Sequence, residues 1–356
     1  MPLEQDPVLS IIVPLLNEAA ELPGLQETLL DQLGIRFELI LCDGGSSDAT
    51  LRLAQQMATD CTVAVRCIQA PRGRGRQMNA GAAIALSNTL LFLHADSRFV
   101  AQDALSSAAT ALSKRQAETA SRVAARFALR FRRQESGPSL AYSFYEAKAR
   151  LNRVDCIRGD QGLLMARSFF EELGGFDESL PFLEDFRLAQ AIGERAEWML
   201  LPTEISTSAR RFEAEGFYER QVANAIIVNA AVCGWSEFFS ALPGLYRCSS
   251  ESGRMLLFPL LDGIRTLLSR HPPAWRLSFW HATGQHVAAN IWQLFFWLDV
   301  RRAFRNGAIQ TEIPTYWGRL FDSYLEPLTR SPAIAAITAA AVWLWHRALL
   351  IIRRHG

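Results

Sequence analysis

The hydrophobic positions in the first half of the chain follow two alternating patterns. Short unbroken apolar runs predict strands buried on both faces, and longer stretches with apolar residues every three or four positions predict amphipathic helices. The apolar runs are residues 8–16, 37–42, 62–68 and 89–94. The helical stretches are residues 21–33 and 48–59, and a glycine- and arginine-rich loop over residues 70–81 leads into a third helix that ends at about residue 85. This alternation indicates a Rossmann-like, mostly parallel open sheet with helices on both faces.

The pattern changes after residue 100. Phe127, Leu129 and Phe131 alternate with arginines, which predicts a half-exposed antiparallel strand over residues 126–132. Further helices are predicted over residues 102–112, 140–151, 168–173 and 186–192, and further strands over residues 163–166 and 198–201. From about residue 217 the chain reads as helical and rich in aromatic residues. We therefore expect an α/β domain over residues 1–216, followed by an all-helical region, residues 217–356, whose role the sequence does not define.

The most apolar stretch of the helical region is residues 332–352. It has about the length that a membrane span needs. His346 and Arg347 interrupt it, and Arg353 and Arg354 follow. Because a span would bury Arg347, we predict a packed terminal helix or a helix that lies on a membrane surface.

Charge and cysteine content narrow the classes of function. The net charge of +1 gives no electrostatic case for binding nucleic acid, while Arg72, Arg74 and Arg76 favour a small anionic ligand. The six cysteines form no Cys-x-x-Cys pair and have no histidine spacing suited to zinc, which indicates free thiols in a reducing compartment. The acidic N-terminus lacks a basic segment ahead of the first apolar run. We predict no signal peptide and a cytoplasmic location, at the inner face of the membrane if the C-terminal helices contact it.

A carboxylate closes the second predicted strand. Asp43 is followed by two glycines and then by a polar cluster that opens a helix. The carboxyl ends of strands in open α/β sheets are where ligands bind, so Asp43 is placed to contact one. Taken alone, Asp43 has a simpler explanation, which is that it caps the turn.

Six motifs follow one another along the chain. They are Pro14-x-x-Asn17-Glu18, Asp43-Gly44-Gly45-Ser46-x-Asp48, Arg72-Gly73-x-Gly75-x-x-x-Asn79-x-Gly81, His94-Ala95-Asp96, Gly159-Asp160-Gln161 and Glu184-Asp185. In order and approximate spacing they resemble the family 2 glycosyltransferases of the GT-A fold, from residue 8 to about residue 212. The His-Ala-Asp and Gly-Asp-Gln elements are most similar to a bacterial subgroup labelled arsenosugar-biosynthesis-type glycosyltransferases. The resemblance implies transfer, with inversion, of a sugar from a UDP- or GDP-sugar to an acceptor hydroxyl or phosphate.

The resemblance also implies roles for individual residues in holding the donor. The implied nucleotide contacts are Pro14, Asn17, Glu18, Asp43, Gly45, Arg72, Arg76, Asn79 and Asp96. Asp96 matches the last carboxylate of the family's Asp-x-Asp metal motif, and His94 stands where the first Asp usually is. One protein carboxylate can suffice for Mg²⁺ or Mn²⁺ if the donor diphosphate supplies further oxygens. Gly44 stands where many relatives carry a second acid.

The same resemblance implies the catalytic group. Asp185, with Glu184 beside it, matches the general base that takes the proton of the acceptor hydroxyl in inverting members. The implied contacts to the donor sugar or acceptor are Gly159, Asp160, Gln161, Arg210 and Arg211.

Other functions remain open from the sequence. The aromatic C-terminal helices favour a lipid or polyprenyl-phosphate acceptor at the membrane surface as a rival to a small soluble acceptor. The histidine in the metal motif is also consistent with a module that binds nucleotide sugars without catalysis, although the Glu184-Asp185 pair argues against it. A sugar nucleotidylyltransferase would need a Gly-x-Gly-x-Arg loop after the first strand, where this chain has residues 14–18, so we set that class aside.

Overall fold

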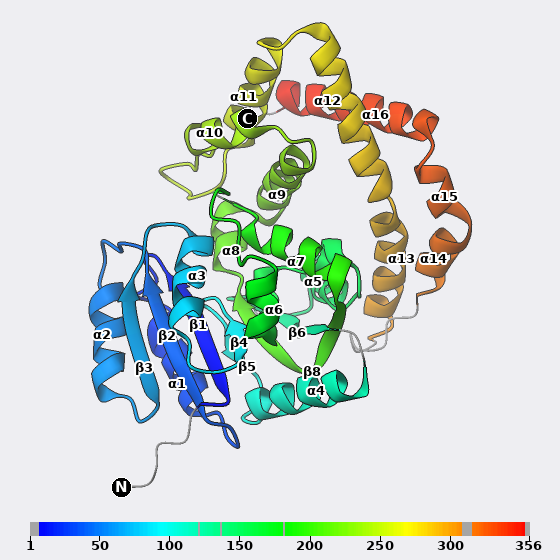
Figure 1. The fold of residues 1–356 in the computed structure, drawn as a ribbon. Coiled ribbons are helices and arrows are strands. Elements are labelled where there is room, and N and C mark those ends of the chain that lie inside the picture. The colour runs from blue at the N-terminus through cyan, green and yellow to red at the C-terminus, as the bar shows by residue number, and fades with distance from the viewer. Residues whose placement is uncertain (1–6, 120–121, 136, 181, 308–314, 353–356) are drawn as a thin grey trace, which may run out of the picture. The chain divides into compact units, whose positions relative to one another are not determined.

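The fold is known from a computed structural model of the chain (Figure 1). The structure describes residues 7–119, 122–135, 137–180, 182–307 and 315–352. The chain divides into two compact units: the first consists of residues 1–132 and 145–208, and the second of residues 133–144 and 209–356. We describe each unit by itself.

The first unit is built on a single open sheet. Its strands are β1 (Leu9–Leu15), β2 (Phe37–Asp43), β3 (Ala64–Gln69), β4 (Thr89–Phe92), β5 (Arg98–Phe99), β6 (Val123–Arg132), β7 (Leu163–Ala166) and β8 (Glu197–Ser208). They are arranged in the order β3-β2-β1-β4-β7-β6-β8-β5. The first four strands of this order run parallel, β7 runs against both of its neighbours, and β6 and β8 pair in parallel again.

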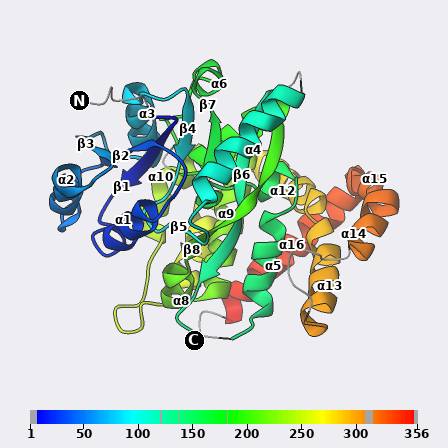
Figure 2. The ribbon, with the colours of Figure 1, turned by 90° about the horizontal axis from the view of Figure 1, so that it is seen from below.

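Helices cover both faces of this sheet. They are α1 (Leu22–Leu30), α2 (Thr50–Asp60), α3 (Arg74–Ile84), α4 (Ala104–Glu118), α6 (Arg167–Glu172) and α7 (Glu184–Arg195). In β1, Ile11 and Val13 pack into a core with α1, α2 and α4, whereas Ile12 packs into the opposite core with α3, α6 and α7. Figure 2 shows α4 lying across β6 and β8, on the face of the sheet that also carries α1 and α2. Both sides of each central strand are therefore apolar, which explains the unbroken apolar runs in the sequence.

The strand directions bring the polar segments to one edge of the sheet. The carboxyl ends of β1, β2 and β4 lie at this edge because these strands are parallel. β7 is antiparallel, so the turn that precedes it, η2 (Gly159–Gln161), arrives at the same edge. β6 and β8 end there as well, at Arg132 and Ser208. This carboxyl edge is the part of the fold that matters for function.

Two predictions about local structure are wrong. The predicted strand over residues 126–132 is part of β6, and it pairs antiparallel with β7 as expected. The predicted exposed face is wrong at Arg126, which is completely buried because β6 lies inside the sheet, between β7 and the parallel strand β8. The alternation of apolar residues and arginines did not predict this burial, because it assumes that every arginine faces solvent. Arg126 faces inward, and its burial lowers the pKa of its side chain to about 10. The second error concerns residues 74–81, which form the first two turns of α3 instead of a loop. Arg76 and Asn79 are therefore helical.

Gly81 explains why a glycine-containing segment forms a helix at this place. A Cβ atom on Gly81 would lie 2.5 Å from Ile12 Cγ2 and 2.8 Å from Cys42 Sγ. The helix approaches β1 and β2 closely because Gly81 has no side chain, so tertiary packing outweighs the low helix propensity of glycine.

The second unit is helical in the part of the chain that the structure describes. Its helices are α8 (Arg210–Glu215), α9 (Phe217–Val232), α10 (Ser236–Leu245), α11 (Leu257–Ser269), α12 (Pro273–Ala289), α13 (Trp292–Arg305), α14 (Tyr316–Leu320), a π-helical turn (Phe321–Leu325), α15 (Glu326–Thr329) and α16 (Pro332–Ile352). Its core gathers apolar side chains of α9, α10, α11, α12 and α16. In the described residues α16 is long and apolar enough to cross a membrane by length and composition, but such a single helix is weak evidence for a span.

The α/β class and the all-helical C-terminal region are confirmed. Helix α5 (Leu140–Ala149) begins in the second unit and ends in the first. The domain division at residues 216 and 217 stays a prediction, and the compact units differ from it in that residues 133–144 and 209–216 join the C-terminal helices.

Candidate functional site

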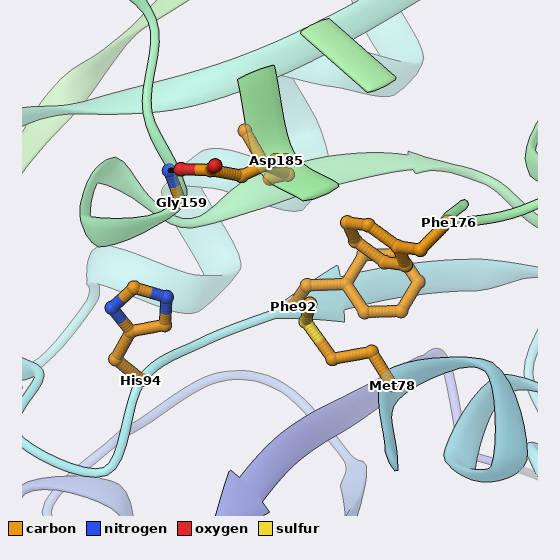
Figure 3. A pocket seen from close by; sticks show the side chains of 7 residues that line it. Met78, Phe92, His94, Gly159, Phe176 and Asp185 are labelled. Carbon is orange, nitrogen blue, oxygen red and sulfur yellow. Dashed lines mark hydrogen bonds between the residues drawn. The ribbon is translucent and has the colours of Figure 1, made fainter. Parts of the chain in front are cut away.

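Asp185, His94 and Gly159 meet at the carboxyl edge of the sheet. Asp185 is the second residue of α7, and its Oδ2 accepts a hydrogen bond from the backbone N–H of Gly159 at 2.7 Å (Figure 3). Its Oδ1 accepts one from the N–H of Phe186 at 2.8 Å. A Cβ atom on Gly159 would lie 2.9 Å from His94 Nε2, so only glycine fits between the two side chains. The carboxylate of Asp185 is thereby fixed beside the imidazole.

These three residues line one pocket together with apolar side chains. The other lining residues are Met78, Phe92, Leu163 and Phe176. The rings of Phe92 and Phe176 are 5.0 Å apart and nearly perpendicular, which gives the pocket a rigid apolar wall (Figure 3). Its volume of about 10 Å³ is at the lower limit for one water molecule. In this structure the pocket accommodates at most a group of about that size.

Glu184, next to Asp185, is held by an arginine from another helix. Its Oε1 lies 3.1 Å from Nη1 of Arg74 on α3. Glu184 is only 2% exposed, and this burial raises its pKa, while the Arg74 guanidinium opposes the rise. Leu183, the residue before α7, has a left-handed backbone with φ of 66°. The ion pair and this turn together set the start of α7, and so the position of Asp185.

Asp160 and Gln161 follow Gly159 and carry unsatisfied oxygens. Within the described part of the chain, Asp160 Oδ1 and Gln161 Oε1 are buried without a hydrogen-bond partner. Burial, followed by the nearby Asp185 and Asp96 carboxylates, raises the pKa of Asp160 to about 7. Buried polar atoms in proteins are normally paired, so these two acceptors mark a place where a ligand donor group would be stabilised.

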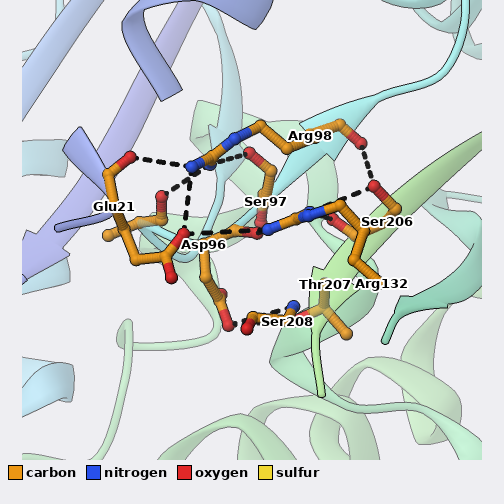
Figure 4. Close-up of polar contacts among 9 residues, drawn as sticks. Glu21, Asp96, Ser97, Arg98, Arg132, Ser206, Thr207 and Ser208 are labelled. Carbon is orange, nitrogen blue, oxygen red and sulfur yellow. Dashed lines mark hydrogen bonds and ion pairs between the residues drawn. The ribbon is translucent and has the colours of Figure 1, made fainter. Parts of the chain in front are cut away.

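Asp96 is anchored to the ends of β6 and β8 (Figure 4). Its Oδ2 accepts hydrogen bonds from Thr207 Oγ1 at 3.2 Å and from the Ser208 N–H at 3.4 Å. Its backbone carbonyl accepts one from Arg132 Nη2 at 2.7 Å. Arg98 Nη2 donates to Glu21 Oε2 at 3.0 Å in the same network. These contacts join the loop after β4 to the residue before α1, to the end of β6 and to the end of β8, more than a hundred residues later in the chain.

Asp43 makes the contacts of a turn cap. It is completely buried, and its Oδ2 accepts hydrogen bonds from the N–H groups of Gly45 at 2.9 Å and Ser46 at 3.1 Å. Gly45 has a φ of 85°, a backbone conformation that suits glycine. A Cβ atom on Gly44 would lie 2.9 Å from Gln77 Cδ, which shows why a second acid does not fit here without displacing Gln77.

The loops after β1 and β2 are tied together. Ser47 N–H donates to Asn17 Oδ1 at 2.8 Å, and Glu18 N–H donates to Thr50 Oγ1 at 2.8 Å. Pro14 lies in β1, opposite Cys42 of β2. Asn17, Glu18, Asp43 and Pro14 therefore gather on two neighbouring strand ends, as the sequence led us to expect.

The remaining predicted residues are dispersed. Arg72 and Arg76 are exposed around the start of α3. The side-chain amide of Asn79 is fully engaged in holding the segment around Phe176: its Nδ2 donates to Phe176 O, and its Oδ1 accepts from Phe176 N–H, both at 2.9 Å. Arg210 and Arg211 begin α8 and belong to the second unit.

The residues proposed to hold a metal provide few protein ligands. Among the residues that the structure describes, no group of three or more His, Cys, Asp or Glu side chains is arranged to hold an ion. His94 and Asp96 offer one imidazole and one carboxylate, both at the carboxyl end of β4. This donor set fits Mg²⁺ or Mn²⁺ only if a ligand contributes oxygens of its own.

Several residues at the site were not predicted from the sequence. Arg74 was noted only for its charge, although it pairs with Glu184, and Arg98, Arg132 and Thr207 were not assigned to the site at all. Gln77 was also missed: its Nε2 donates to the carbonyls of Leu15 and Cys42, both at 2.7 Å, and so joins the ends of β1 and β2. Their partners are distant in sequence, so no local pattern could have identified them.

The fold and site define an open α/β protein with carboxylates and backbone donors gathered at the carboxyl edge of its sheet. Residues 10–174 match the family model described as glycosyl transferase family 2. This match, over just under half of the chain, and the glycosyltransferase relatives below support the predicted family for this part of the chain. They do not support the more specific subgroup.

Curated relatives match a shorter part of the chain. A PGL/p-HBAD biosynthesis glycosyltransferase of Mycobacterium tuberculosis is 39% identical over 102 residues, which are 28% of this chain and 39% of the relative. An uncharacterized glycosyltransferase of Haemophilus influenzae is 34% identical over 93 residues, which are 26% of this chain and 31% of the relative. In each case the match spans well under half of the relative's length.

The solved structures that match this chain have low sequence identity and TM-scores just under 0.5. Staphylococcus aureus TarS 1–349 in complex with UDP is 14% identical, with a TM-score of 0.49, over 84% of this chain and 91% of that one. The mannosyltransferase PcManGT from Pyrobaculum calidifontis, in complex with GDP-Man and Mn²⁺, is 17% identical, with a TM-score of 0.49, over 96% of this chain and 88% of that one.

Proposed function

We propose that this chain is a glycosyltransferase that moves a sugar, with inversion, from a UDP- or GDP-sugar to an acceptor hydroxyl or phosphate. The observation that carries the proposal is the carboxylate of Asp185, held by two backbone N–H groups beside His94 in a chain that matches the glycosyl transferase family 2 model over residues 10–174. The subgroup labelled arsenosugar-biosynthesis-type stays a prediction based on the His94-Ala95-Asp96 and Gly159-Asp160-Gln161 motifs.

Asp185 is the group that we assign as general base. Two backbone N–H groups, those of Gly159 and Phe186, hold its carboxylate oxygens in place at the edge of the pocket. When the acceptor oxygen attacks the anomeric carbon, the bond from that carbon to the diphosphate breaks, and the acceptor hydroxyl proton moves to Asp185. Attack from the face opposite the diphosphate inverts the configuration of the sugar.

The ends of β1 and β2 and the loops that follow them are our proposed nucleotide contacts, through Pro14, Asn17, Glu18, Asp43 and Gly45. Arg72 before α3 and Arg76 and Asn79 in its first two turns are further proposed contacts, and Asn79 would act while its amide holds the segment around Phe176. The backbone N–H groups that Asp43 holds in place make a preformed turn, which reduces the ordering cost of binding.

The oxygens of Asp160 and Gln161 are our proposed contacts to sugar hydroxyls. Each hydroxyl can donate one hydrogen bond, which would pair Asp160 Oδ1 and Gln161 Oε1. Arg210 and Arg211 are kept as contacts to the diphosphate or to an anionic acceptor.

His94 and Asp96 would hold Mg²⁺ or Mn²⁺, with diphosphate oxygens as further ligands. The ion would neutralise negative charge on the departing diphosphate. The chain's own part is to hold Asp96 still, and its contacts with Thr207 and Ser208 do this. We propose that the protein acts in the cytoplasm.

A thermal-shift panel with UDP, GDP and their sugars, each with and without Mn²⁺, tests donor binding. A ligand that binds only the folded chain raises the melting temperature, and the shift should grow when Mn²⁺ is present. A protein that responds to none of these ligands would contradict the proposal. Turnover with the best donor, followed by assignment of the product anomer by NMR, then tests inversion.

Two alternatives give different results in the same assays. A module that only binds nucleotide sugars would show the thermal shift without releasing nucleoside diphosphate. A lipid or polyprenyl-phosphate acceptor is favoured by the apolar α16, and it predicts that turnover rises when polyprenyl phosphate is added in vesicles and stays unchanged with soluble alcohols.

A further inference from the structure

The outer side of α16 carries apolar residues where a water-facing helix would carry polar ones. Ile337, Leu344 and Ile351 follow one another at intervals of seven residues, so they lie along one line of the helix. They are 65%, 59% and 68% exposed. Ala333, Ala340 and Ala348 fill the same side and are exposed as well. We call this set the apolar stripe of α16.

The opposite side of α16 is fixed to the rest of the second unit. Ala335 and Ala339 are buried against α12, where a Cβ atom on Gly284 would lie 2.1 Å from Ala335 O. His346 is buried, and its Nε2 lies 3.0 Å from the carbonyl oxygen of Leu261 on α11. Figure 1 shows α12 and α16 side by side, as their extensive contacts require. These contacts hold the apolar stripe outward.

The residues beside the stripe are of the type found at membrane interfaces. Trp343 and Trp345 are partly exposed, and the guanidinium of Arg347 lies 5.2 Å from the ring centre of Trp343. Tryptophan and arginine are common where an apolar helix face meets lipid headgroups.

The net positive charge of residues 273–356 favours an anionic partner. From residue 273 to the C-terminus the sequence contains nine arginines, no lysine and four acids, a net charge of +5 in a chain whose total is +1. The remainder of the chain is therefore net acidic. A net positive charge in the segment that carries the exposed apolar face, with Arg347 on α16 itself, is complementary to a bilayer that contains anionic lipids.

Helix α12 argues against a transmembrane position for α16. The two helices pack along each other, and α12 carries Arg276, His281, Gln285 and His286. A span would draw these side chains and Arg347 into the hydrocarbon, which is costly. A helix lying in the headgroup region avoids this cost, since only the stripe enters the apolar layer.

We propose that the apolar stripe of α16 is a docking surface for an anionic lipid bilayer, on which the helix lies parallel to the membrane plane. The stripe enters the acyl boundary, and Trp343, Trp345 and Arg347 lie at headgroup level. The partner is the membrane itself, so the proposal does not depend on glycosyl transfer.

Flotation of the full chain with vesicles tests this. We expect binding to vesicles of phosphatidylcholine with phosphatidylserine, weaker binding to phosphatidylcholine alone, and release by high salt or alkaline carbonate. The variant Ile337→Gln, Leu344→Gln, Ile351→Gln should bind at least about tenfold more weakly because it loses apolar contact with the acyl chains. The matched control Leu33→Gln, Leu86→Gln, Val100→Gln changes three side chains of similar exposure in the first unit and should bind as the wild type does.

A second measurement keeps the proposal testable if the stripe variant folds poorly. Brominated lipids should quench tryptophan fluorescence of the wild type, and Trp343→Phe with Trp345→Phe should remove most of that quenching.

Three results would overturn the proposal. The first is no binding to anionic vesicles. The second is self-association of the wild type that the stripe variant abolishes, because the stripe would then contact a second copy of this chain. The third is retention in the membrane after alkaline carbonate, which would make α16 a span. The thermal-shift panel with nucleotide sugars reports on the proposed function separately.

Discussion

At the scale of single residues, Asp185 depends on its neighbours more than on its own sequence context. An acid at the second position of a helix is common, since the helix N-terminus favours negative charge. What distinguishes Asp185 is the N–H of Gly159, which fixes one carboxylate oxygen beside His94. The sequence supplied both residues but not their contact.

Asp185→Asn should abolish transfer and leave donor binding intact. An amide cannot accept the acceptor proton, so we expect turnover to fall by about 10²- to 10⁴-fold. The measurement is release of nucleoside diphosphate in the presence of acceptor, with the donor-induced thermal shift as the binding readout. Asp177→Asn, at an exposed turn, is the matched control and should keep wild-type turnover. Equal turnover of Asp185→Asn and the wild type would remove Asp185 from the mechanism.

Asp160 should make the stability of the protein depend on pH. Its pKa is about 7 in the folded chain, above the ordinary value of an unfolded aspartate. Between about pH 4 and about pH 7 the folded chain holds a proton that the unfolded chain has lost, so the free energy of unfolding falls as pH rises. The variant Asp160→Asn has no carboxyl group to titrate at this position. Its free energy of unfolding, relative to that of the wild type, should therefore increase as the pH rises through this range.

Urea unfolding without donor or metal, at about pH 5 and about pH 8, measures this difference, which we expect to be on the order of 2 kcal/mol. Asp60→Asn, at the exposed end of α2, is the control and should show no such trend. A constant difference between Asp160→Asn and the wild type would mean that Asp160 titrates normally.

At the scale of elements, the start of α7 is positioned by α3. The Arg74–Glu184 pair connects the two helices across 110 positions of sequence. The sequence predicts a loop over residues 70–81 that reaches a ligand, whereas residues 74–81 are helical and have a structural role. The consequence is that α3 acts on Asp185 through Glu184.

Arg74→Ala should destabilise the protein because it leaves the buried Glu184 carboxylate unpaired. We expect a loss of about 1–3 kcal/mol in the free energy of unfolding. Adding Glu184→Gln removes the unpaired charge, so the double variant should be more stable than the sum of the two single losses implies. The exposed pair Arg265–Asp262 on α11 serves as control, and Arg265→Ala should change stability by less than about 0.5 kcal/mol. Additive losses in the Arg74 and Glu184 variants would show that the pair contributes nothing.

At the scale of the whole molecule, the chain crosses between its two compact units more than once. Residues 133–144 leave the first unit and pack with helices that lie after residue 208. The ring of Tyr142 lies 4.9 Å from that of Phe217, and the ring of Phe144 lies 5.8 Å from that of Phe296. A boundary drawn at residue 216 therefore separates side chains that belong together.

A chain that ends at residue 216 should be less stable and less soluble than the full chain. Its Tyr142 and Phe144 would lose Phe217 and Phe296 as packing partners and become exposed, and such apolar exposure promotes association. Binding of a hydrophobic dye and sedimentation measure both effects. The same shortened chain with Tyr142→Ser and Phe144→Ser should bind less dye. If the shortened chain with native residues stays monomeric without binding dye, residues 1–216 form an independent domain.

The sequence by itself determined most of the order of the strands and helices in the first unit, except the two-residue strand β5, and it identified the residues at the strand ends. This was possible because burial on both faces leaves an unbroken apolar run, and because acids and glycines after such runs are local signals. The sequence also identified α16 by its apolar length.

Only the tertiary structure decided which distant residues meet. β6 lies inside the sheet with Arg126 buried, Gly159 binds Asp185, and Arg132 and Thr207 hold Asp96. It also decided which side of α16 faces outward. The physical reason is that strand order and helix packing join residues far apart in the chain, and period-two or period-3.6 patterns do not record which element lies beside which.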